Sequence, residues 1–172
     1  RAQIGDVAGI VEVVRTAFPH DFWFDKKFNP QVCREMFENT IKDPFELVVV
    51  AKQEGRVVGF VFYQNKPPTN GEIYLNMIGI HSDFRGVGIG LRLILAADHE
   101  ALCYFRDDLG CRIATIHLST SADNPLAQRL YQKAGYDKRG EIIGMVGRGN
   151  VEIQMVKDVD DVGYRESLWV KP

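Results

Sequence analysis

Three glycines at alternate positions, Gly86, Gly88 and Gly90, occupy the stretch HSDFRGVGIGLRL between two apolar runs. A glycine costs roughly 0.5–1 kcal/mol relative to alanine, so the local chain must require it, either for a backbone with φ > 0 or for close approach of a ligand. Free backbone N–H groups at the start of a helix form an anion site. The stretch therefore predicts a phosphate-binding turn between a strand and a helix.

Three phosphate-binding patterns can be compared with this turn. A Walker loop needs GxxxxGK[ST], and neither that lysine nor the following hydroxyl residue is present. The dinucleotide fingerprint GxGxxG would place a glycine where Leu93 stands. The pattern RxxGxG fits Arg85, Gly88 and Gly90. Arg85 would add a charge-assisted bond at the rim of the turn or remain a solvated surface residue.

A second motif follows in NPLAQRLYQKAGY, which contains Asn124, Tyr131 and Gly135. Together with MIGIHSDFRGVGIGLRLI, it resembles the GNAT superfamily of N-acetyltransferases, which transfer an acetyl group from acetyl-CoA to an amine. The resemblance extends from about residue 5 to residue 158. It implies one N-acetyltransferase domain over residues 1–158, a tail of unclear role over 159–172, and acetyl-CoA as co-substrate.

The resemblance also implies which residues hold acetyl-CoA. The main chain of Ile78, Gly79 and Ile80 would pair with the pantetheine arm, and Asn124 would contact that arm or serve only as a helix cap. Gly79 is a candidate bulge site that opens a wedge for the thioester, or a packing glycine. The residues implied for the diphosphate are Arg85, Gly86, Val87, Gly88, Ile89, Gly90 and Leu91.

Acid and base candidates complete the implied site. Tyr131 stands where the family has a tyrosine that protonates the departing thiolate, and a phenol with a pKa near 10 can donate at pH 7. The alternative is a tyrosine that only bridges helix and sheet. For the base that deprotonates the amine, we expect Glu72 first, then His117, with a water relay as a further alternative. Ser119 stands where ribosomal-protein acetyltransferases of the family carry a glutamate, which weakens a ribosomal assignment.

The acceptor is a primary amine on a small molecule or a peptide, which the sequence does not name. In the family, the loop between the first two helices and the last hairpin wall the acceptor pocket. Here that loop offers Phe18, His20, Phe22, Trp23 and Phe24. These side chains would cradle an ammonium or apolar group, or only pack in the core.

The tail contains Tyr164 and Trp169. Two uses are open for these side chains. They are candidates for a contact in a homodimer, or for covering the edge of the sheet.

The elements that position these residues follow from periodicity. Expected are helices over residues 5–18 and 29–41, a hairpin over 47–64, a strand over 72–81, a helix over about 88–107, a strand over 111–120, a helix over 124–135 and a hairpin over 136–158. A helical crossover makes strands 72–81 and 111–120 parallel. The fold class is α/β (α+β): a GNAT-type mixed, mostly antiparallel central sheet with a parallel, splayed pair and helices on both faces.

Composition limits the remaining classes. A net charge of −2 argues against a generic nucleic-acid partner. No apolar run approaches the ~18 residues of a membrane span, so no membrane partner is expected. The three cysteines have no CxxC spacing and are expected to be reduced thiols in a cytoplasmic protein. The histidines form no HExxH or Cys/His cluster, so no metal is expected.

The predicted function is transfer of an acetyl group from acetyl-CoA to a primary amine, by direct attack in a ternary complex. The alternative from another class is a non-catalytic acyl-CoA-binding regulatory module on the same fold. Tyr131 favours catalysis, because binding alone needs no phenol there. An oxidoreductase is disfavoured by the missing third glycine and by the topology.

Overall fold

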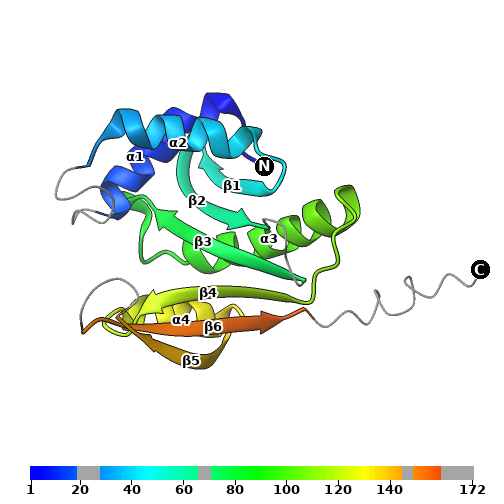
Figure 1. The fold of residues 1–172 in the computed structure, drawn as a ribbon. Helices are drawn as coiled ribbons and strands as arrows, with labels where there is room; N and C mark the ends of the chain where they lie inside the picture. Colours follow the sequence, from blue (N-terminus) through cyan, green and yellow to red (C-terminus); the bar gives the residue numbers. More distant parts are fainter. Residues whose placement is uncertain (19–27, 66–70, 145–148, 160–172) are drawn as a thin grey trace, which may run out of the picture.

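The structure, a computed structural model, describes residues 1–18, 28–65, 71–144 and 149–159. Its main elements (Figure 1) are α1 (Val7–Ala17), α2 (Pro30–Lys42), β1 (Glu46–Gln53), β2 (Arg56–Gln64), β3 (Glu72–Ile80), α3 (Ile89–Leu102), β4 (Thr115–Ser121), α4 (Pro125–Lys133), β5 (Asp137–Ile143) and β6 (Val151–Asp158). No helix within these ranges is long and apolar enough to cross a membrane.

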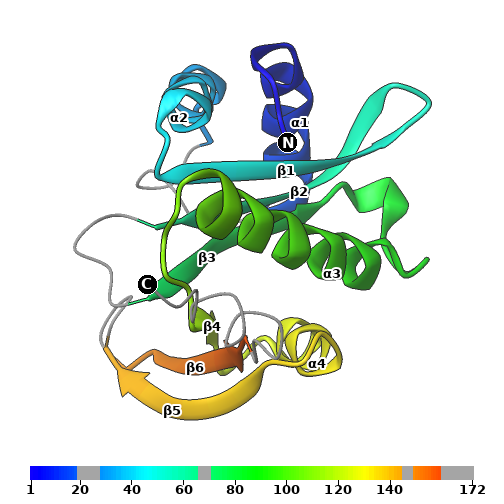
Figure 2. The ribbon, with the colours of Figure 1, turned by 90° about the vertical axis from the view of Figure 1, so that its right-hand side faces the viewer.

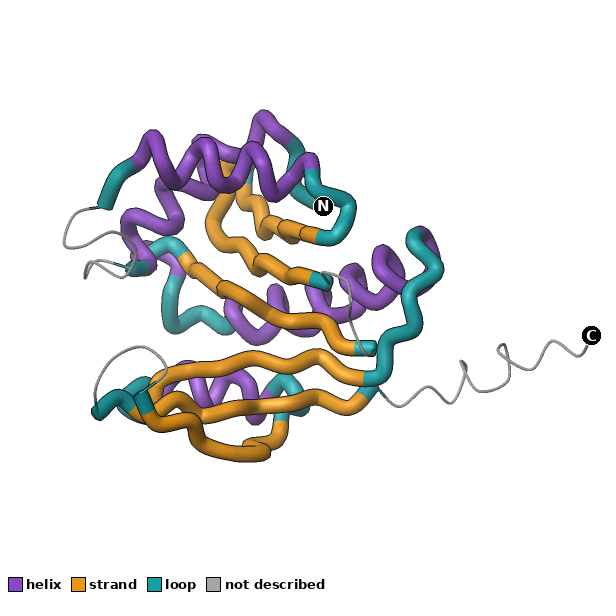
Figure 3. The backbone as a smooth tube through the Cα atoms, in the orientation of Figure 1, coloured by secondary structure: helices purple, strands orange, loops and turns teal. Residues whose placement is uncertain are grey.

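The six strands form one sheet in the order β1-β2-β3-β4-β6-β5 (Figure 3). Only β3 and β4 are parallel, because α3 carries the chain back between them; the other neighbouring pairs are antiparallel. Helices α1 and α2 pack on one face, whereas α3 and α4 pack on the other (Figure 2). The predicted mixed sheet with helices on both faces is confirmed.

Local signals explain where the first helices form. On α1, Ile10 and Val14 are buried one turn apart and face the sheet. On α2, the Asn29 side chain accepts hydrogen bonds from the first-turn amides, and Pro30 occupies the first helical position, where no N–H is needed.

The sheet splits between β3 and β4. The two strands pair only over Glu72–Tyr74 and Thr115–His117, and then diverge (Figure 1). The predicted splayed pair is therefore confirmed. A bulge lies close to the split, since the register with β2 leaves Asn76 without a partner between Leu75 and Met77. Leu75 and Met77 consequently belong to core clusters on opposite faces of the sheet, although they are two residues apart.

Of the two alternatives for Gly79, the structure shows the packing glycine and not the bulge. Gly79 pairs in regular register with Phe60 of β2. A Cβ atom at this position would lie 2.8 Å from Phe60 Cε1 and 3.3 Å from Val13 Cγ1. Glycine is needed there because α1 and β2 pack closely over it, which is the packing alternative.

Two element ends differ from expectation. The α-helix stops at Leu102 and is followed by a π-helical turn, Cys103–Asp108, before Gly110 at φ 69°. The next strand begins at Thr115, not at Cys111, because the backbone amide of Cys111 forms its hydrogen bond outside the sheet. The Cys111 amide donates to the carbonyl of Phe105, which ties this stretch to the π-helical turn.

Candidate active site

A groove of about 670 Å³ lies at the carboxyl end of β3, between the start of α3 and the side of α4. This edge of an α/β sheet is where ligands commonly bind. The groove is lined by Ala17, Phe18, Ile78, Ile80, Phe84, Arg85, Gly86, Gly88, Ile89, Gly90, Leu91, Asn124, Leu126, Ala127, Arg129, Leu130 and Lys133. It therefore brings together most of the residues predicted for acetyl-CoA.

The glycine turn owes two of its glycines to backbone conformation. Gly86 and Gly88 have φ angles of 79° and 80°, and Gly88 is the N-cap of α3. No atom lies within 4 Å of a Cβ built on either residue, so conformation rather than crowding demands glycine there. A Cβ on Gly90 would lie 3.6 Å from Leu130 Cδ2, inside the groove. The first amides of α3 lack intrahelical acceptors, which makes this end suited to an anion.

Arg85 is neither free nor simply solvated. Its guanidinium donates to the carbonyl of Ala17 at 2.9 Å, and its Nε donates to the carbonyl of Ile80 at 3.2 Å. Arg85 thereby fastens the glycine turn to the end of α1 while it still lines the groove. Among the residues predicted for acetyl-CoA, Gly79 and Val87 do not line it. The three predicted catalytic residues, Tyr131, Glu72 and His117, do not line it either.

The α4 wall of the groove carries cations that the sequence motifs did not identify. Arg129 and Lys133, one helical turn apart, both line the groove. In the sequence, only their spacing of four residues could have indicated a shared binding face, and this spacing is also common on solvated faces of helices. Asn124 caps α4, because its Oδ1 accepts from the Ala127 amide at 3.1 Å. The helix-cap alternative for Asn124 is therefore present in the structure.

Tyr131 lies on the inner side of α4 and is 6 % exposed. Its ring meets the ring of Tyr136 edge-on, with centroids 6.0 Å apart. Burial raises the pKa of Tyr131 above its ordinary value, and the nearby Tyr74 adds to this effect. The phenol therefore stays protonated at neutral pH and can act as a donor.

The two predicted base residues lie together at the point where the sheet splits. His117 Nε2 is 3.6 Å from a Glu72 carboxylate oxygen. The imidazole lies against the Tyr74 ring, with centroids 5.0 Å apart, and the Tyr74 hydroxyl is 3.4 Å from the Ser119 hydroxyl. Burial lowers the pKa of His117, and the charge of Glu72 partly opposes this shift. A neutral imidazole beside a carboxylate can accept a proton and keep it.

A polar strip continues from this cluster onto β6. The register pairs Ser119 with Gln154 and Ser121 with Glu152, on the face that carries His117. Glu152 is 8 % exposed, and burial raises its pKa. Within the described residues, the side-chain carboxylate of Glu152 has no hydrogen-bond or ion-pair partner. Sequence patterns missed this strip because only strand register brings its members together.

Two sets of predicted residues cannot be placed. Phe18 lines the groove, but the rest of the aromatic loop, at positions 20 and 22–24, falls outside the described residues. Tyr164 and Trp169 also fall outside them, so the homodimer contact and the role of the tail stay predictions.

All three cysteines are unpaired thiols. No group of residues in the described part of the chain could hold a metal ion.

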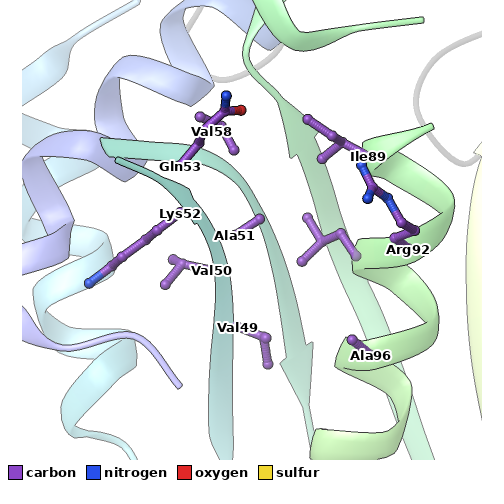
Figure 4. A pocket seen from close by; sticks show the side chains of 10 residues that line it. Val49, Val50, Ala51, Lys52, Gln53, Val58, Ile89, Arg92 and Ala96 are labelled. Atoms are coloured by element: carbon purple, nitrogen blue, oxygen red, sulfur yellow. The ribbon is translucent and has the colours of Figure 1, made fainter. Parts of the chain in front are cut away.

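A second hollow, of about 380 Å³, lies between β1 and α3. Figure 4 shows Ile89, Arg92 and Ala96 of α3 facing Val49 and Ala51 of β1 across it. Apart from Ile89, it contains no residue predicted for the site. The groove at the glycine turn is therefore the candidate site.

Comparison with known proteins decides what this arrangement is. The model of the acetyltransferase (GNAT) family matches residues 10–136, which contain the glycine turn, the split strands and α4. The chain belongs to the GNAT family. The resemblance predicted from the two motifs is thus confirmed.

Among relatives of this GNAT protein is one from Bacillus subtilis subsp. natto (strain BEST195), named "Probable spermine N(1)-acetyltransferase". The two are 32% identical over 95 residues, which cover 52% of this chain and 58% of the relative. The chain therefore spans less than two thirds of that relative's length.

Solved structures share the fold. A ribosomal-protein-alanine N-acetyltransferase from Brucella melitensis has a TM-score of 0.71 at 23% identity, over 92% of this chain and 97% of that chain. A Salmonella typhimurium structure that contains acetyl-CoA has a TM-score of 0.73 at 18% identity, over 94% of this chain and 93% of that chain. At these identities the likeness shows the GNAT fold alone.

Proposed function

We propose that this GNAT protein transfers the acetyl group of acetyl-CoA to a primary amine of a small molecule. The observation that carries the proposal is the position of Tyr131, which is buried on α4 directly after Leu130, a residue that lines the groove at the glycine turn. The spermine acetyltransferase relative supports an amine acceptor with several cationic groups. A peptide amine is the alternative acceptor.

The groove is proposed to bind the CoA portion. Amides at the start of α3, from Gly88 onward, would bind the diphosphate, since several N–H groups point there without intrahelical acceptors. The exposed edge of β3 at Ile78 and Ile80 would pair with the pantetheine arm, where β4 has diverged. Arg129 and Lys133 are proposed to contact the remaining phosphate of CoA, which is the 3′-phosphate.

Acetyl-CoA, when bound, supplies a thioester whose carbonyl carbon is open to attack by a neutral amine. The new C–N bond forms as the C–S bond breaks. Tyr131 is proposed to donate its phenolic proton to the leaving sulfur, because burial, which raises its pKa, keeps the phenol protonated before the reaction. The attacking nitrogen loses its second proton to solvent to give the neutral amide, and solvent returns a proton to the phenolate.

The amine must first lose a proton, because amines arrive largely as ammonium ions. His117 is proposed to accept this proton, and Glu72 to stabilise the imidazolium that forms. This reverses the order expected from the sequence, because His117 is half-buried with a lowered pKa, whereas the Glu72 side chain is 55% exposed. A water molecule between the amine and His117 remains compatible with this role.

The polar strip on β4 and β6 is proposed to bind the acceptor. The carboxylate of Glu152 and the amide of Gln154 lie in register beside Ser119, on the face opposite α4. A carboxylate that has no cationic partner within the described residues would favour an acceptor with an ammonium group.

Thiol release from acetyl-CoA, measured with a panel of polyamines, amino acids, aminoglycosides and N-terminal peptides, tests the proposal. Release that depends on a polyamine supports it, and release with peptides alone moves the acceptor to the alternative class. Acetyl-CoA binding, read by thermal shift, without release from any amine would refute catalysis and favour a binding module.

A further inference from the structure

Asp98, on the inner side of α3, is a buried carboxylate with no role in the mechanism above. It is 2 % exposed. One of its oxygens accepts hydrogen bonds from the hydroxyls of Tyr63 at 2.6 Å and Tyr136 at 2.8 Å. The other accepts from the Lys157 ammonium at 2.8 Å. Burying a carboxylate is unfavourable unless it is fully paired, so this set of four residues specifies one particular arrangement.

The four residues come from both sides of the split sheet. Tyr63 belongs to β2, whereas Tyr136 precedes β5 and Lys157 lies on β6. The strands themselves join the two sides by only three residue pairs, between β3 and β4. Asp98 therefore links the two halves of the sheet on the face that carries α3 and α4.

The network also reaches Tyr131 through one aromatic contact. The Tyr136 ring meets the Tyr131 ring edge-on. Tyr136 is itself fixed twice, by its bond to Asp98 and by the Lys157 ammonium 5.6 Å from its ring centroid. Within the described part of the chain, the Tyr131 hydroxyl has no hydrogen-bond partner, so its direction depends on ring packing.

We propose that Asp98 is a positioning residue for Tyr131: by holding the hydroxyl of Tyr136, it sets the ring against which Tyr131 packs. This inference rests on the proposed function, in which Tyr131 is the proton donor. Burial and the neighbouring carboxylate raise the pKa values of Tyr63 and Tyr136, so both hydroxyls remain donors to Asp98 across the physiological range.

The structure supplies a matched pair of variants. Tyr136→Phe removes one hydroxyl from the Asp98 oxygen on the side that contacts Tyr131. Tyr63→Phe removes the other hydroxyl from the same oxygen, on the β2 side, from a ring that, within the described residues, makes no edge-on ring contact with Tyr131. Both variants keep the aromatic ring and lose one hydrogen bond to Asp98. If the network only stabilises the fold, both should alter Tyr131 and its activity to a similar extent. If the network positions Tyr131, only Tyr136→Phe should alter them.

The position of Tyr131 can be read without activity, from ¹⁹F NMR of protein labelled with fluorotyrosine. The chain has six tyrosines, and the resonance of Tyr131 is identified by its loss in Tyr131→Phe. We expect Tyr136→Phe to shift this resonance and Tyr63→Phe to leave it in place. An unshifted Tyr131 resonance in folded Tyr136→Phe would overturn the inference.

Kinetics then test the consequence for catalysis. We expect Tyr136→Phe to lower kcat about tenfold, since small misplacements of a reacting group are costly, with the acetyl-CoA KM within about twofold of wild type. The loss should vanish in a Tyr131→Phe background. An equal loss in both backgrounds, or an equal loss in Tyr63→Phe, would overturn positioning. If the wild-type protein transferred no acetyl group, the proposed function would be refuted instead. The Tyr131 resonance still tests positioning in that case, so the two failures are distinguishable.

Discussion

Replacing Tyr131 with phenylalanine removes one hydroxyl and keeps the buried ring. General acids contribute about 10²–10⁴-fold to a rate. A thiol with a pKa near 8.5 leaves readily by itself, so the lower end of this range applies. We therefore expect kcat to fall about 100-fold, equivalent to about 2.7 kcal/mol of transition-state stabilisation.

Stability and binding should change little in this variant. The lost hydroxyl has no hydrogen-bond partner among the residues that the structure describes, so its removal breaks no such bond and should be close to neutral for folding. The midpoint of thermal unfolding and the acetyl-CoA dissociation constant should therefore match wild type. The matched control is Tyr104→Phe, which removes a hydroxyl that donates to the Pro44 carbonyl and should leave kcat unchanged.

Steady-state thiol release at saturating amine and acetyl-CoA measures the effect. A kcat for Tyr131→Phe within twofold of wild type would refute the reasoning. A fall in kcat that came with a matching loss of acetyl-CoA binding would equally contradict it, because the hydroxyl would then be a binding group.

Three further predictions follow from the site. First, kcat/KM should fall as the pH drops through the lowered pKa of His117, below about 6.5, because the protonated imidazole cannot accept a proton. Glu72→Gln should move this inflection of the pH–rate profile to lower pH, and an unmoved inflection would contradict the proposed interaction between Glu72 and His117. Second, Arg129→Gln should weaken CoA binding about tenfold but leave the binding of dephospho-CoA, which lacks only the 3′-phosphate, unchanged by calorimetry. Equal losses would exclude a contact with the 3′-phosphate. Third, Gly88→Ala should lower the free energy of unfolding by about 1–2 kcal/mol in denaturant titrations, because alanine is strained at φ 80°; Gly90→Ala, which makes only ordinary contacts, is the control, and an equal loss there would contradict this explanation.

Local patterns predicted much of the fold and of the groove. The residues around Gly86, Gly88 and Gly90 sit between a strand and a helix, and backbone conformation, which is a local property, accounts for two of the three. Apolar periodicity placed the strands and helices, and the helical crossover required β3 and β4 to be parallel. Cap residues such as Asn29 and Asn124 marked helix starts because their signals lie within four residues.

Features that depend on packing between distant segments could not be predicted. A glycine in a strand suits both a bulge and a close contact, so the sequence left both alternatives open for Gly79, and only the packing of α1 and β2 distinguishes them. The contact between Glu72 and His117 depends on the register of β3 against β4, which neither strand encodes alone. The network around Asp98 joins α3, β2 and β6 with the residue that precedes β5, and no spacing in the sequence predicts it.

The central claim is direct acetyl transfer at the split sheet, and the masses of amine and protein after one reaction test it most directly. The protein, acetyl-CoA labelled in the acetyl group, and each amine of the panel would be mixed and analysed by mass spectrometry. We expect one amine class to carry the labelled acetyl group, in amounts equal to the released thiol, with the protein mass unchanged. Bound acetyl-CoA with every amine unlabelled, or label held covalently on the protein, would contradict the account.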